Sequence, residues 1–520
     1  MFLKITTKSM NGRKIMSEEQ LQDAANAQQE QQKSEDIFTQ RLGKMQELID
    51  AGIAPYGVKV EGIMPTADVV KKYIPDVENT EEFVVAGRLM GIRVMGKVSF
   101  AHLKDDSGKL QLYVQRDLLG DEEYKRFKRL DIGDIIAAKG HLFTTKTGEI
   151  TLKLSSYTML SKSLRPLPEK FHGLTDMEQR YRQRYLDLIT NDESKELLRK
   201  RITIIREIRN YLEGKGFLEV ETPMLQYIPG GAAATPFKTH YNALNCDMYM
   251  RIAPELFLKR LLVGGFEKVF ELNRNFRNEG ISRRHNPEFT MLELYQAYGD
   301  CQTMQELVED MVTTVAEKVF GTLKIQLPND KVIDLTRPWR RAPYKELICE
   351  KMGADWFELS QHDKYVKAKA LGAQVMPDFT DLEITHEIYE KFIEQTLIQP
   401  TFVTRLPAEL VPLAKKCPDD PTLVDVYELE INGQEISPGY SELNDPVEQR
   451  KRFMEQVTLT GKDPAQAVDD DFLSALEYGM PPAGGLGIGI DRLVMLLTGT
   501  ESIRDVVLFP QLRPRVAGNN

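Results

Sequence analysis

Hydrophobic and polar residues alternate most regularly between positions 270 and 295. Before a loop at 281–288, one face of a two-residue repeat carries Phe270, Leu272 and Phe276, and the opposite face carries charged and amide side chains at 271, 273, 275, 277 and 279. After the loop, one face carries Phe289, Met291, Glu293 and Tyr295. The pattern predicts an antiparallel hairpin with one apolar face. The other face is either a solvated outer surface or a buried site for a charged ligand.

Short strands dominate an earlier part of the chain. Residues 17–55 predict one long polar helix with a narrow apolar stripe, and residues 82–160 predict five short strands with one helix among them. This order indicates an OB barrel, a fold that often binds single-stranded nucleic acid but also serves as a structural module. Phe100 and Gln111 should lie on neighbouring strands of the barrel.

Two later segments complete the pattern. Residues 196–215 predict an amphipathic helix, followed by a strand at 217–225, and residues of about 325–400 predict a mostly helical insertion. We expect an N-terminal extension and helix over 1–69, the OB-fold domain over 70–163, a proline-punctuated linker over 164–184 and a second domain over 185–520.

Composition narrows the class of protein. A chain of 520 residues should hold two or three domains, and its lack of a long apolar run predicts no membrane span. The N-terminus has no apolar stretch of signal-peptide length, and Met16 is an alternative start to Met1. The four dispersed cysteines predict a reducing, cytoplasmic setting. The net charge of -10 weighs mildly against nucleic-acid binding, although a local basic strip can coexist with it.

Three ordered stretches of sequence carry a family resemblance. RNEGISRRHNPEFTMLELYQAY at 277–298, FLEVETPML at 217–225 and GGLGIGIDRLVMLL at 484–497 resemble the signature motifs of class II aminoacyl-tRNA synthetases, and the first resembles the lysine-specific branch. The resemblance implies an α+β protein in which an N-terminal OB-fold β-barrel, the anticodon-binding domain, precedes a class II catalytic domain. That domain would be a mixed, mainly antiparallel sheet flanked by helices. It also implies a homodimer with Pro223 at the centre of the interface.

The resemblance also implies the reaction. L-lysine and ATP would give lysyl-adenylate and pyrophosphate, and lysine would then pass to the 3′-terminal adenosine of tRNA(Lys). Such chemistry depends on positioning and charge stabilisation, so it requires arginines and Mg2+ instead of a side-chain nucleophile. The chain has no GxxxxGK[ST] loop and no dinucleotide-binding context for its glycine-rich segment. The catalytic residues would be Arg277 and Arg492, and the ATP-binding residues would be Arg277, Glu279, His285, Asn286, Phe289, Glu428 and Arg492.

An acidic hairpin is the expected metal site. Asn432 and Gly433 predict a two-residue turn, which places Glu430 opposite Glu435 and Glu428 diagonal to Glu435 on the same face. All three carboxylates are suitable for hard cations that bridge phosphates, and a solvated acidic hairpin is the alternative. The family pattern selects Glu428 and Glu435, whereas the register alone would equally allow Glu430.

Carboxylates are expected to select the substrate. A pocket for an ammonium ion needs acidic groups left without protein partners, whereas an aspartate enzyme would need basic ones. The resemblance assigns lysine binding to Gly231, Glu255, Glu293, Tyr295, Tyr440 and Glu442, and anticodon binding to Arg93, Phe100, Gln111 and Glu149. Two positions depart from the family, which usually has Arg in the stretch that here gives Thr235 and often has Asn at Pro438.

Three alternatives compete with this interpretation. The first is another class II specificity, for aspartate or asparagine, which the acidic pocket disfavours. The second is a class II-like lysine ligase that modifies a protein, which the OB-like segment disfavours. The third is a catalytically inactive nucleic-acid-binding paralogue, which should have lost Arg277, Glu279 or Arg492, all of which are present.

Overall fold

The computed structural model describes residues 18–75, 77–168, 176–460 and 468–514, with no side-chain detail at 18–31 and 456–460. The alternative starts at Met1 and Met16 therefore lie outside the described residues, as does part of the expected linker. The chain forms two compact units, residues 1–175 with 514–520 and residues 176–513. Among the described residues, no helix has the length and apolar character needed to cross a membrane.

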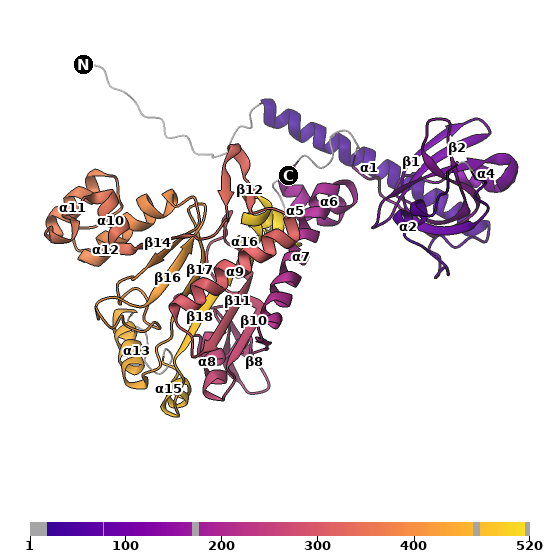
Figure 1. The fold of residues 1–520 in the computed structure, drawn as a ribbon. Coiled ribbons are helices and arrows are strands. Elements are labelled where there is room, and N and C mark those ends of the chain that lie inside the picture. The colour runs from indigo at the N-terminus through magenta and orange to yellow at the C-terminus, as the bar shows by residue number, and fades with distance from the viewer. Residues whose placement is uncertain (1–17, 76, 169–175, 461–467, 515–520) are drawn as a thin grey trace, which may run out of the picture. The chain divides into compact units, whose positions relative to one another are not determined.

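The first unit is built on a closed five-stranded barrel with strand order β1-β2-β3-β5-β4 (Figure 1). Successive side chains of a strand point to opposite faces, and this explains the core of the barrel. Within Lys109–Gln115, Leu110, Leu112 and Val114 are buried, whereas Gln111 and Tyr113 are less buried. The elements of this unit are α1 (Glu18–Asp50), α2 (Thr66–Lys71), β1 (Glu82–Met95), β2 (Val98–Lys104), β3 (Lys109–Gln115), α3 (Arg116–Leu119), α4 (Asp121–Phe127), β4 (Ile135–Thr144) and β5 (Ile150–Ser161).

The second unit is built on an eight-stranded sheet with strand order β14-β15-β16-β17-β18-β11-β10-β6. Two of its pairings, β14 with β15 and β10 with β6, are parallel, and the others are antiparallel. The strands of this sheet are β6 (Leu218–Glu219), β10 (Lys268–Phe276), β11 (Glu288–Ala297), β14 (Arg340–Pro343), β15 (Thr401–Thr404), β16 (Val426–Glu430), β17 (Glu435–Ser441) and β18 (Ala483–Gly489). The predicted fold class, a barrel followed by a mixed and mainly antiparallel sheet, is confirmed.

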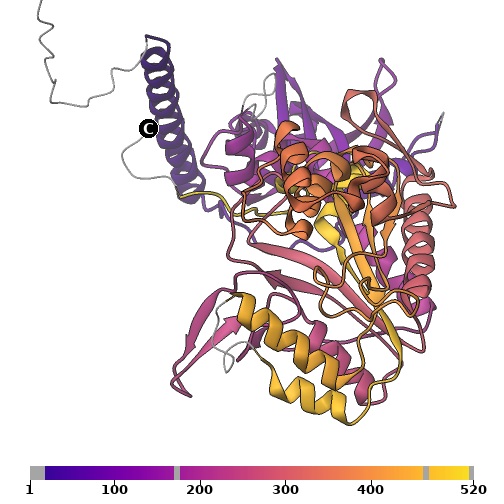
Figure 2. The same cartoon turned by 90° about the vertical axis from the view of Figure 1, so that its left-hand side faces the viewer.

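Helices flank this sheet. Two long ones, α7 (Asp192–Gly214) and α9 (Cys301–Phe320), run beside each other and bury apolar side chains such as Ile208 and Met311 in one core with the sheet (Figure 1). The shorter ones are α5 (Met177–Arg182), α6 (Arg184–Thr190), α8 (Glu255–Val263), α13 (Pro446–Thr460), α15 (Asp470–Glu477), α16 (Ile490–Thr498) and α17 (Ile503–Val506). Of these, α13 and α15 lie side by side (Figure 2).

The expected strand at 217–225 is mostly wrong. Only the two residues of β6 join the main sheet, and a second short strand, β7 (Leu225–Gln226), pairs instead with β9 (Cys246–Met250). Pro223 lies between them and has no N–H to donate to a ladder, which explains the break. In the same small sheet, β8 (Lys238–Tyr241) pairs with β9.

The region between α9 and β15 begins with strands and continues with helices. The strands β12 (Lys324–Gln326) and β13 (Val332–Asp334) pair with each other, and α10 (Tyr344–Met352), α11 (Gln361–Ala370) and α12 (Asp381–Ile388) follow β14. Trp356, Ile348 and Ile384 bury a small apolar core of their own in this region. A short turn, Glu394–Thr396, then leads toward the acidic hairpin.

Candidate active site

The predicted hairpin forms from β10 and β11, although β10 ends at Phe276, so Arg277 and Glu279 follow the strand instead of sharing its face. Asn275 faces Phe289, Asn273 faces Met291 and Glu271 faces Glu293 across the ladder. Glu271 is satisfied within the protein, because Arg251 donates to its carboxylate at 2.6 Å and both side chains are buried. Glu293 lies opposite it, and among the described residues no Lys or Arg forms an ion pair with it.

Three arginines, Arg277, Arg284 and Arg492, line one hollow of about 280 Å³ beside this hairpin. Arg277 follows β10, and its guanidinium lies 5.1 Å from the centroid of the Phe289 ring. Its Nε is buried without a hydrogen-bond partner among the described residues, and burial lowers the pKa of the side chain. The charges of Glu279 and Glu435 oppose this shift but do not cancel it, and a buried donor without a partner is costly unless an anion binds there. The hollow is therefore a site for negative charge.

Arg492 reaches the same hollow from the first turn of α16. It donates from Nη1 to the backbone oxygen of Glu435 at 2.9 Å, and its Nη2 lies 2.9 Å from Nε2 of His285. The preceding residue, Asp491, accepts from the backbone N–H of Thr290 at 2.8 Å and forms an ion pair with Arg201 at 2.5 Å. These contacts fix the start of α16 against β11. Because a helix N-terminus carries partial positive charge, it adds to the attraction for anions.

The loop residues predicted for ATP gather around the arginines. The backbone N–H of Thr235 donates to the Glu279 carboxylate at 3.3 Å, so the departure at Thr235 leaves a main-chain contact in place. His285 bonds to Ser282 at 2.9 Å, and burial together with nearby Arg492 lowers its pKa. A neutral imidazole can sit beside a guanidinium and accept its hydrogen bond. The Asn286 side chain donates to the backbone oxygen of Glu288 at 2.6 Å, which fixes the loop end.

The acidic hairpin forms with the predicted turn and the predicted pairing of Glu430 with Glu435, but its register shifts between Leu429 and Glu430. Asn432 and Gly433 have φ of 58° and 64°, and the N–H of Ile431 donates to the oxygen of Gln434, so the expected two-residue turn is confirmed. Glu430 faces Glu435, whereas Glu428 faces Pro438 across the ladder. Pro438 also lines the hollow that holds Arg277.

The carboxylates of this hairpin repel one another. Burial raises the pKa of Glu428 to about 8 and that of Glu430 to about 10, and the charges of Glu435 and Glu394 add to both shifts. Glu394, in the turn before β15, is a member of this group that sequence reasoning missed. No three His, Cys, Asp or Glu side chains within the described part of the chain are grouped so as to ligate an ion alone.

A second group of carboxylates surrounds the start of α8. Glu255 is its first residue, and Gly231 comes so near that a Cβ added there would lie 3.0 Å from the Cβ of Glu255. Tyr440 donates its hydroxyl to Oε1 of Glu255 at 2.9 Å, and Tyr295 donates to Glu293 at 3.2 Å. Burial, together with the charge of Glu255, raises the pKa of Glu293 to about 8. The six residues predicted for lysine binding thus converge, with Glu442 at the far side.

The carboxylate of Glu442 has room only because Gly485 of β18 has no side chain. A Cβ on Gly485 would lie 2.1 Å from Oε1 of Glu442 and 2.5 Å from the Tyr295 ring. Only glycine leaves room for this carboxylate and ring together. The glycine-rich segment 484–489 therefore shapes the carboxylate pocket, in addition to lining the arginine hollow through Gly489.

The expectation that the pocket carboxylates lack protein partners is wrong. Lys259, which is completely buried on α8, forms ion pairs with both Glu255 and Glu442. Sequence reasoning missed this residue, although its distance of four positions from Glu255 on a helix is a recognisable pairing signal. The pocket contains a cation of its own.

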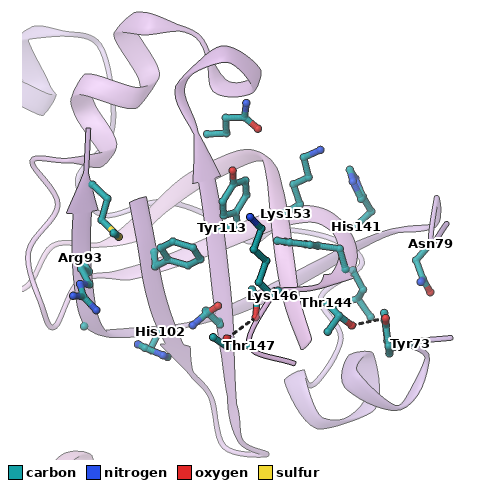
Figure 3. A pocket seen from close by; sticks show the side chains of 18 of the residues that line it. Tyr73, Asn79, Arg93, His102, Tyr113, His141, Thr144, Lys146, Thr147 and Lys153 are labelled. Carbon is teal, nitrogen blue, oxygen red and sulfur yellow. Dashed lines mark hydrogen bonds between the residues drawn. The ribbon is translucent and has the colours of Figure 1, made fainter. Parts of the chain in front are cut away.

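The first unit holds a separate hollow of about 970 Å³ on one face of the barrel. Phe100 of β2 faces Arg93 of β1 and Tyr113 of β3 across the ladders. Its ring centroid lies 5.4 Å from that of Tyr113, which in turn lies 5.3 Å from that of Phe143. Figure 3 shows Arg93, His102, Tyr113 and Lys153 around this hollow.

Gln111 and Glu149 are joined directly in this unit. The Gln111 amide donates to Glu149 at 2.7 Å and accepts from the Thr151 hydroxyl at 2.9 Å. Gln111 lines the hollow together with Arg93 and Phe100, so three of the four residues predicted for the anticodon meet there and Glu149 orients one of them. Tyr113 and Phe143 extend the aromatic row and were missed, although Tyr113 shares its strand face with Gln111.

Comparisons with known proteins match both units. A family model described as tRNA synthetases class II (D, K and N) matches residues 176–513, and one described as OB-fold nucleic acid binding domain matches residues 83–160. A lysine–tRNA ligase of Pelotomaculum thermopropionicum is 52% identical over 502 residues, which cover 96% of this chain and 99% of the relative. The lysine–tRNA ligase of Carboxydothermus hydrogenoformans is 53% identical, and the match covers 94% of this chain and all of the relative. That of Shouchella clausii is 50% identical, and the match covers 93% of this chain and 98% of the relative.

Proposed function

Because the chain belongs to the lysine–tRNA ligases among the class II aminoacyl-tRNA synthetases, we propose that its second unit activates L-lysine with ATP between the arginine hollow and the carboxylate pocket. Lysyl-adenylate and pyrophosphate form there, and lysine then passes to the 3′-terminal adenosine of tRNA(Lys). One observation carries this assignment. Arg277 and Arg492, two of the three arginines that line one hollow, form no ion pair in the described part of the chain, and they lie near the buried carboxylates Glu255, Glu293 and Glu442.

The arginine hollow binds ATP in this proposal. Arg277 holds the α-phosphate and the substrate carboxylate, because a planar guanidinium matches both anions. Arg492 holds the γ-phosphate at the N-terminus of α16. Phe289 stacks on adenine, and Glu279, His285 and Asn286 contact the base, ribose or phosphates from the loop between β10 and β11. These groups are fixed before the reaction, so they can stabilise charge that develops in the transition state.

The residues of the acidic hairpin fit Mg2+. Their carboxylates repel one another, and the buried Oε2 of Glu430 has no hydrogen-bond partner among the described residues. Glu428 and Glu435 would hold the ion, with phosphate oxygens of ATP completing its ligands, since Mg2+ usually takes one or two carboxylates and substrate phosphates. When bound, Mg2+ neutralises phosphate charge. The protein itself holds Glu435 in the lining of the hollow, where its charge also acts on Arg277.

The carboxylate pocket recognises lysine. Glu255, with the nearby backbone of Gly231, takes the α-ammonium, and Glu293 and Glu442 take the ε-ammonium beside Tyr295 and Tyr440. An amino acid with a neutral side chain would leave the buried carboxylates unpaired. This cost is the basis on which the pocket discriminates lysine from other amino acids. The contact that Asn gives in other members at the position of Pro438 is replaced here by main chain or lost.

Lysine-dependent exchange of pyrophosphate into ATP tests the assignment. We expect exchange with L-lysine and at most a small fraction of that rate with aspartate, asparagine, arginine or norleucine. Norleucine matters most, because it has the length of lysine without the ε-ammonium. Equal exchange with lysine and aspartate would contradict the proposed pocket.

The barrel hollow reads the anticodon of tRNA(Lys) in this proposal. Phe100 stacks on a base, Gln111 bonds to its edge, and Arg93 supplies positive charge for the backbone. Phe100→Ala or Gln111→Ala should lower kcat/KM for tRNA charging by about tenfold or more, because stacking of a base is worth about 1 to 3 kcal/mol. Pyrophosphate exchange should stay unchanged, since that reaction takes place in the second unit.

Tyr56→Ala is the matched control for the barrel variants. Tyr56 is an exposed aromatic residue of the same unit that does not line the hollow. We expect this variant to charge tRNA at the wild-type rate. If Phe100→Ala also charged tRNA normally at low tRNA concentration, the anticodon role of the hollow would be refuted.

We also propose a cytoplasmic homodimer. The four cysteines are free, as in proteins from reducing compartments. Leu218, Leu225 and Tyr227, which are close to Pro223 in sequence, are exposed apolar side chains, and apolar surface of this kind is suited to contact with a second copy. Light scattering should give about twice the mass of the chain, and a mass of one chain at micromolar concentration would contradict the dimer.

A further inference from the structure

The amino-acid pocket contains an internal ammonium group. Lys259 is fully buried on α8, one helical turn beyond Glu255, and its Nζ lies 2.7 Å from Oε1 of Glu255. The same Nζ forms an ion pair with Oε2 of Glu442 and lies 5.6 Å from the centroid of the Tyr440 ring. These contacts join the two carboxylates that, in the proposed function, receive the two ends of lysine.

We propose that Lys259 is a positioning residue that selects for a diamino acid, by bracing Glu255 and Glu442 and by leaving the pocket with the charge that lysine's two ammonium groups neutralise. This inference rests on the proposed lysine site. It assigns to Lys259 no contact with the reacting atoms.

Lys259 contacts one oxygen of each carboxylate. Lys259 and the Tyr440 hydroxyl both donate to Oε1 of Glu255. Both oxygens of Glu442 are buried without a hydrogen bond among the described residues, and Oε2 is the one that forms the ion pair with Lys259. Oε1 of Glu442, beside Gly485, is therefore left for an ammonium group of the substrate.

The charges of the pocket balance only with Lys259 present. Glu255, Glu293 and Glu442 supply three negative charges when ionised, and Lys259 supplies one positive charge, so two negative charges remain. Substrate lysine brings two ammonium groups, while its carboxylate is met by Arg277 outside the pocket. A buried, unpaired charge is strongly unfavourable. An amino acid with one ammonium leaves such a charge, and a pocket without Lys259 leaves one even with lysine bound.

The protonation of the pocket follows from the same contacts. Four titratable groups face the ion pair of Lys259 and Glu442, and Arg251 and Arg277 lie further away. The four groups are Glu255 on α8, Glu293 and Tyr295 on β11, and Tyr440 on β17. Burial raises the pKa of Glu442, and Lys259 opposes that rise. Without Lys259 the carboxyl should keep its proton to a higher pH. Because only the ionised carboxylate pairs with an ammonium, lysine should then bind well only at higher pH.

The test replaces Lys259 by methionine, which has similar volume and no charge. Lys364→Met is the matched control, since Lys364 is also buried and pairs with Asp381 in the region between α9 and β15. Pyrophosphate exchange is measured while lysine and ATP are varied separately, from about pH 6.5 to 9. For Lys259→Met we expect kcat/KM for lysine to fall by about a hundredfold, with KM for ATP within about twofold. Its pH profile for lysine should move upward by about one unit, whereas Lys364→Met should keep the wild-type profile.

The outcomes separate the inference from the function on which it rests. Absence of lysine-dependent exchange in the wild-type chain would refute the proposed function itself. Wild-type exchange together with an unmoved pH profile in Lys259→Met, or a loss shared equally by lysine and ATP, would overturn the role of Lys259.

A second variant covers the case in which Lys259→Met does not fold. Lys259→Met with Glu442→Gln removes both charges of one pair and restores two net negative charges, so it should fold. It should bind lysine weakly but retain the wild-type pH dependence. An upward shift of its profile would contradict the charge balance.

Discussion

Arg277→Ala and Arg492→Ala should each lower lysine-dependent pyrophosphate exchange by about a hundredfold to a thousandfold, because each removes a fixed donor to charge that develops in the transition state. Folding should not suffer. Within the part of the chain that the structure describes, the buried Nε of Arg277 has no partner, and burial lowers the pKa of the side chain, so its charge costs stability in the free protein. The melting temperature of Arg277→Ala should therefore equal or exceed that of the wild type, and a calorimetric scan beside the exchange assay checks both expectations.

A neighbouring arginine provides the control. Arg274 lies on the same strand as the residues before Arg277, but its side chain is partly exposed and pairs with Glu288 at 3.8 Å. Arg274→Ala should keep nearly normal exchange, since exposed ion pairs contribute little. Near-normal exchange in Arg277→Ala would show that the hollow is not the phosphate site. A large fall in melting temperature would show that Arg277 has a structural role.

The local geometry of the site followed closely from the sequence. A two-residue alternation predicted the hairpin of β10 and β11 and its faces, and Asn432 with Gly433 predicted the turn that pairs Glu430 with Glu435. Both are short-range features, in which side-chain alternation and positive φ leave few alternatives. The resemblance to the lysine branch of class II synthetases, and with it the function, is also confirmed.

Partners brought together from distant segments could not be predicted in this way. Lys259 and Glu442 are far apart in sequence, and a helical Glu-to-Lys pair such as that of Glu255 and Lys259 is usually an exposed ion pair of small effect. The burial of that pair in the second unit depends on how α8 packs beside β11 and β17. Phe143 likewise joins Phe100 and Tyr113 only when the barrel closes.

The two halves of the site share one physical property. Each holds a buried group whose charge nearby groups of opposite sign do not fully compensate, Arg277 in the hollow beside Glu279 and Glu435, and Glu293 in the pocket. Such groups reduce stability in the free protein and are compensated when ligands of opposite charge bind. ATP and lysine meet these needs separately, because one is strongly anionic and the other carries two ammonium groups. Substitutions in one half should therefore affect one substrate far more than the other.

For this reason, Glu293→Gln should weaken the binding of lysine far more than the binding of ATP. Glu293 is 4% exposed and accepts a hydrogen bond from Tyr295. We therefore expect the ammonium group of substrate lysine to be the cation that pairs with it. Removal of one member of a buried charge pair costs about 3 to 5 kcal/mol, which is about a hundredfold or more in kcat/KM for lysine. Glu442→Gln should act in the same direction, but it also leaves Lys259 with a single carboxylate, so its effect on stability should be larger.

Pyrophosphate exchange, measured while lysine and ATP are varied separately, shows whether Glu293 recognises the side chain of lysine or stabilises the fold. Glu288→Gln is the control for Glu293→Gln, because Glu288 lies on the same strand but is partly exposed and pairs with Arg274. The control should leave both substrates unchanged. In Glu293→Gln, KM for lysine should rise while KM for ATP stays within about twofold, and the rate with norleucine relative to lysine should increase because the glutamine no longer requires a cation. If both substrates lost affinity equally and norleucine gained nothing, Glu293 would hold the sheet together and would not read the side chain of the substrate.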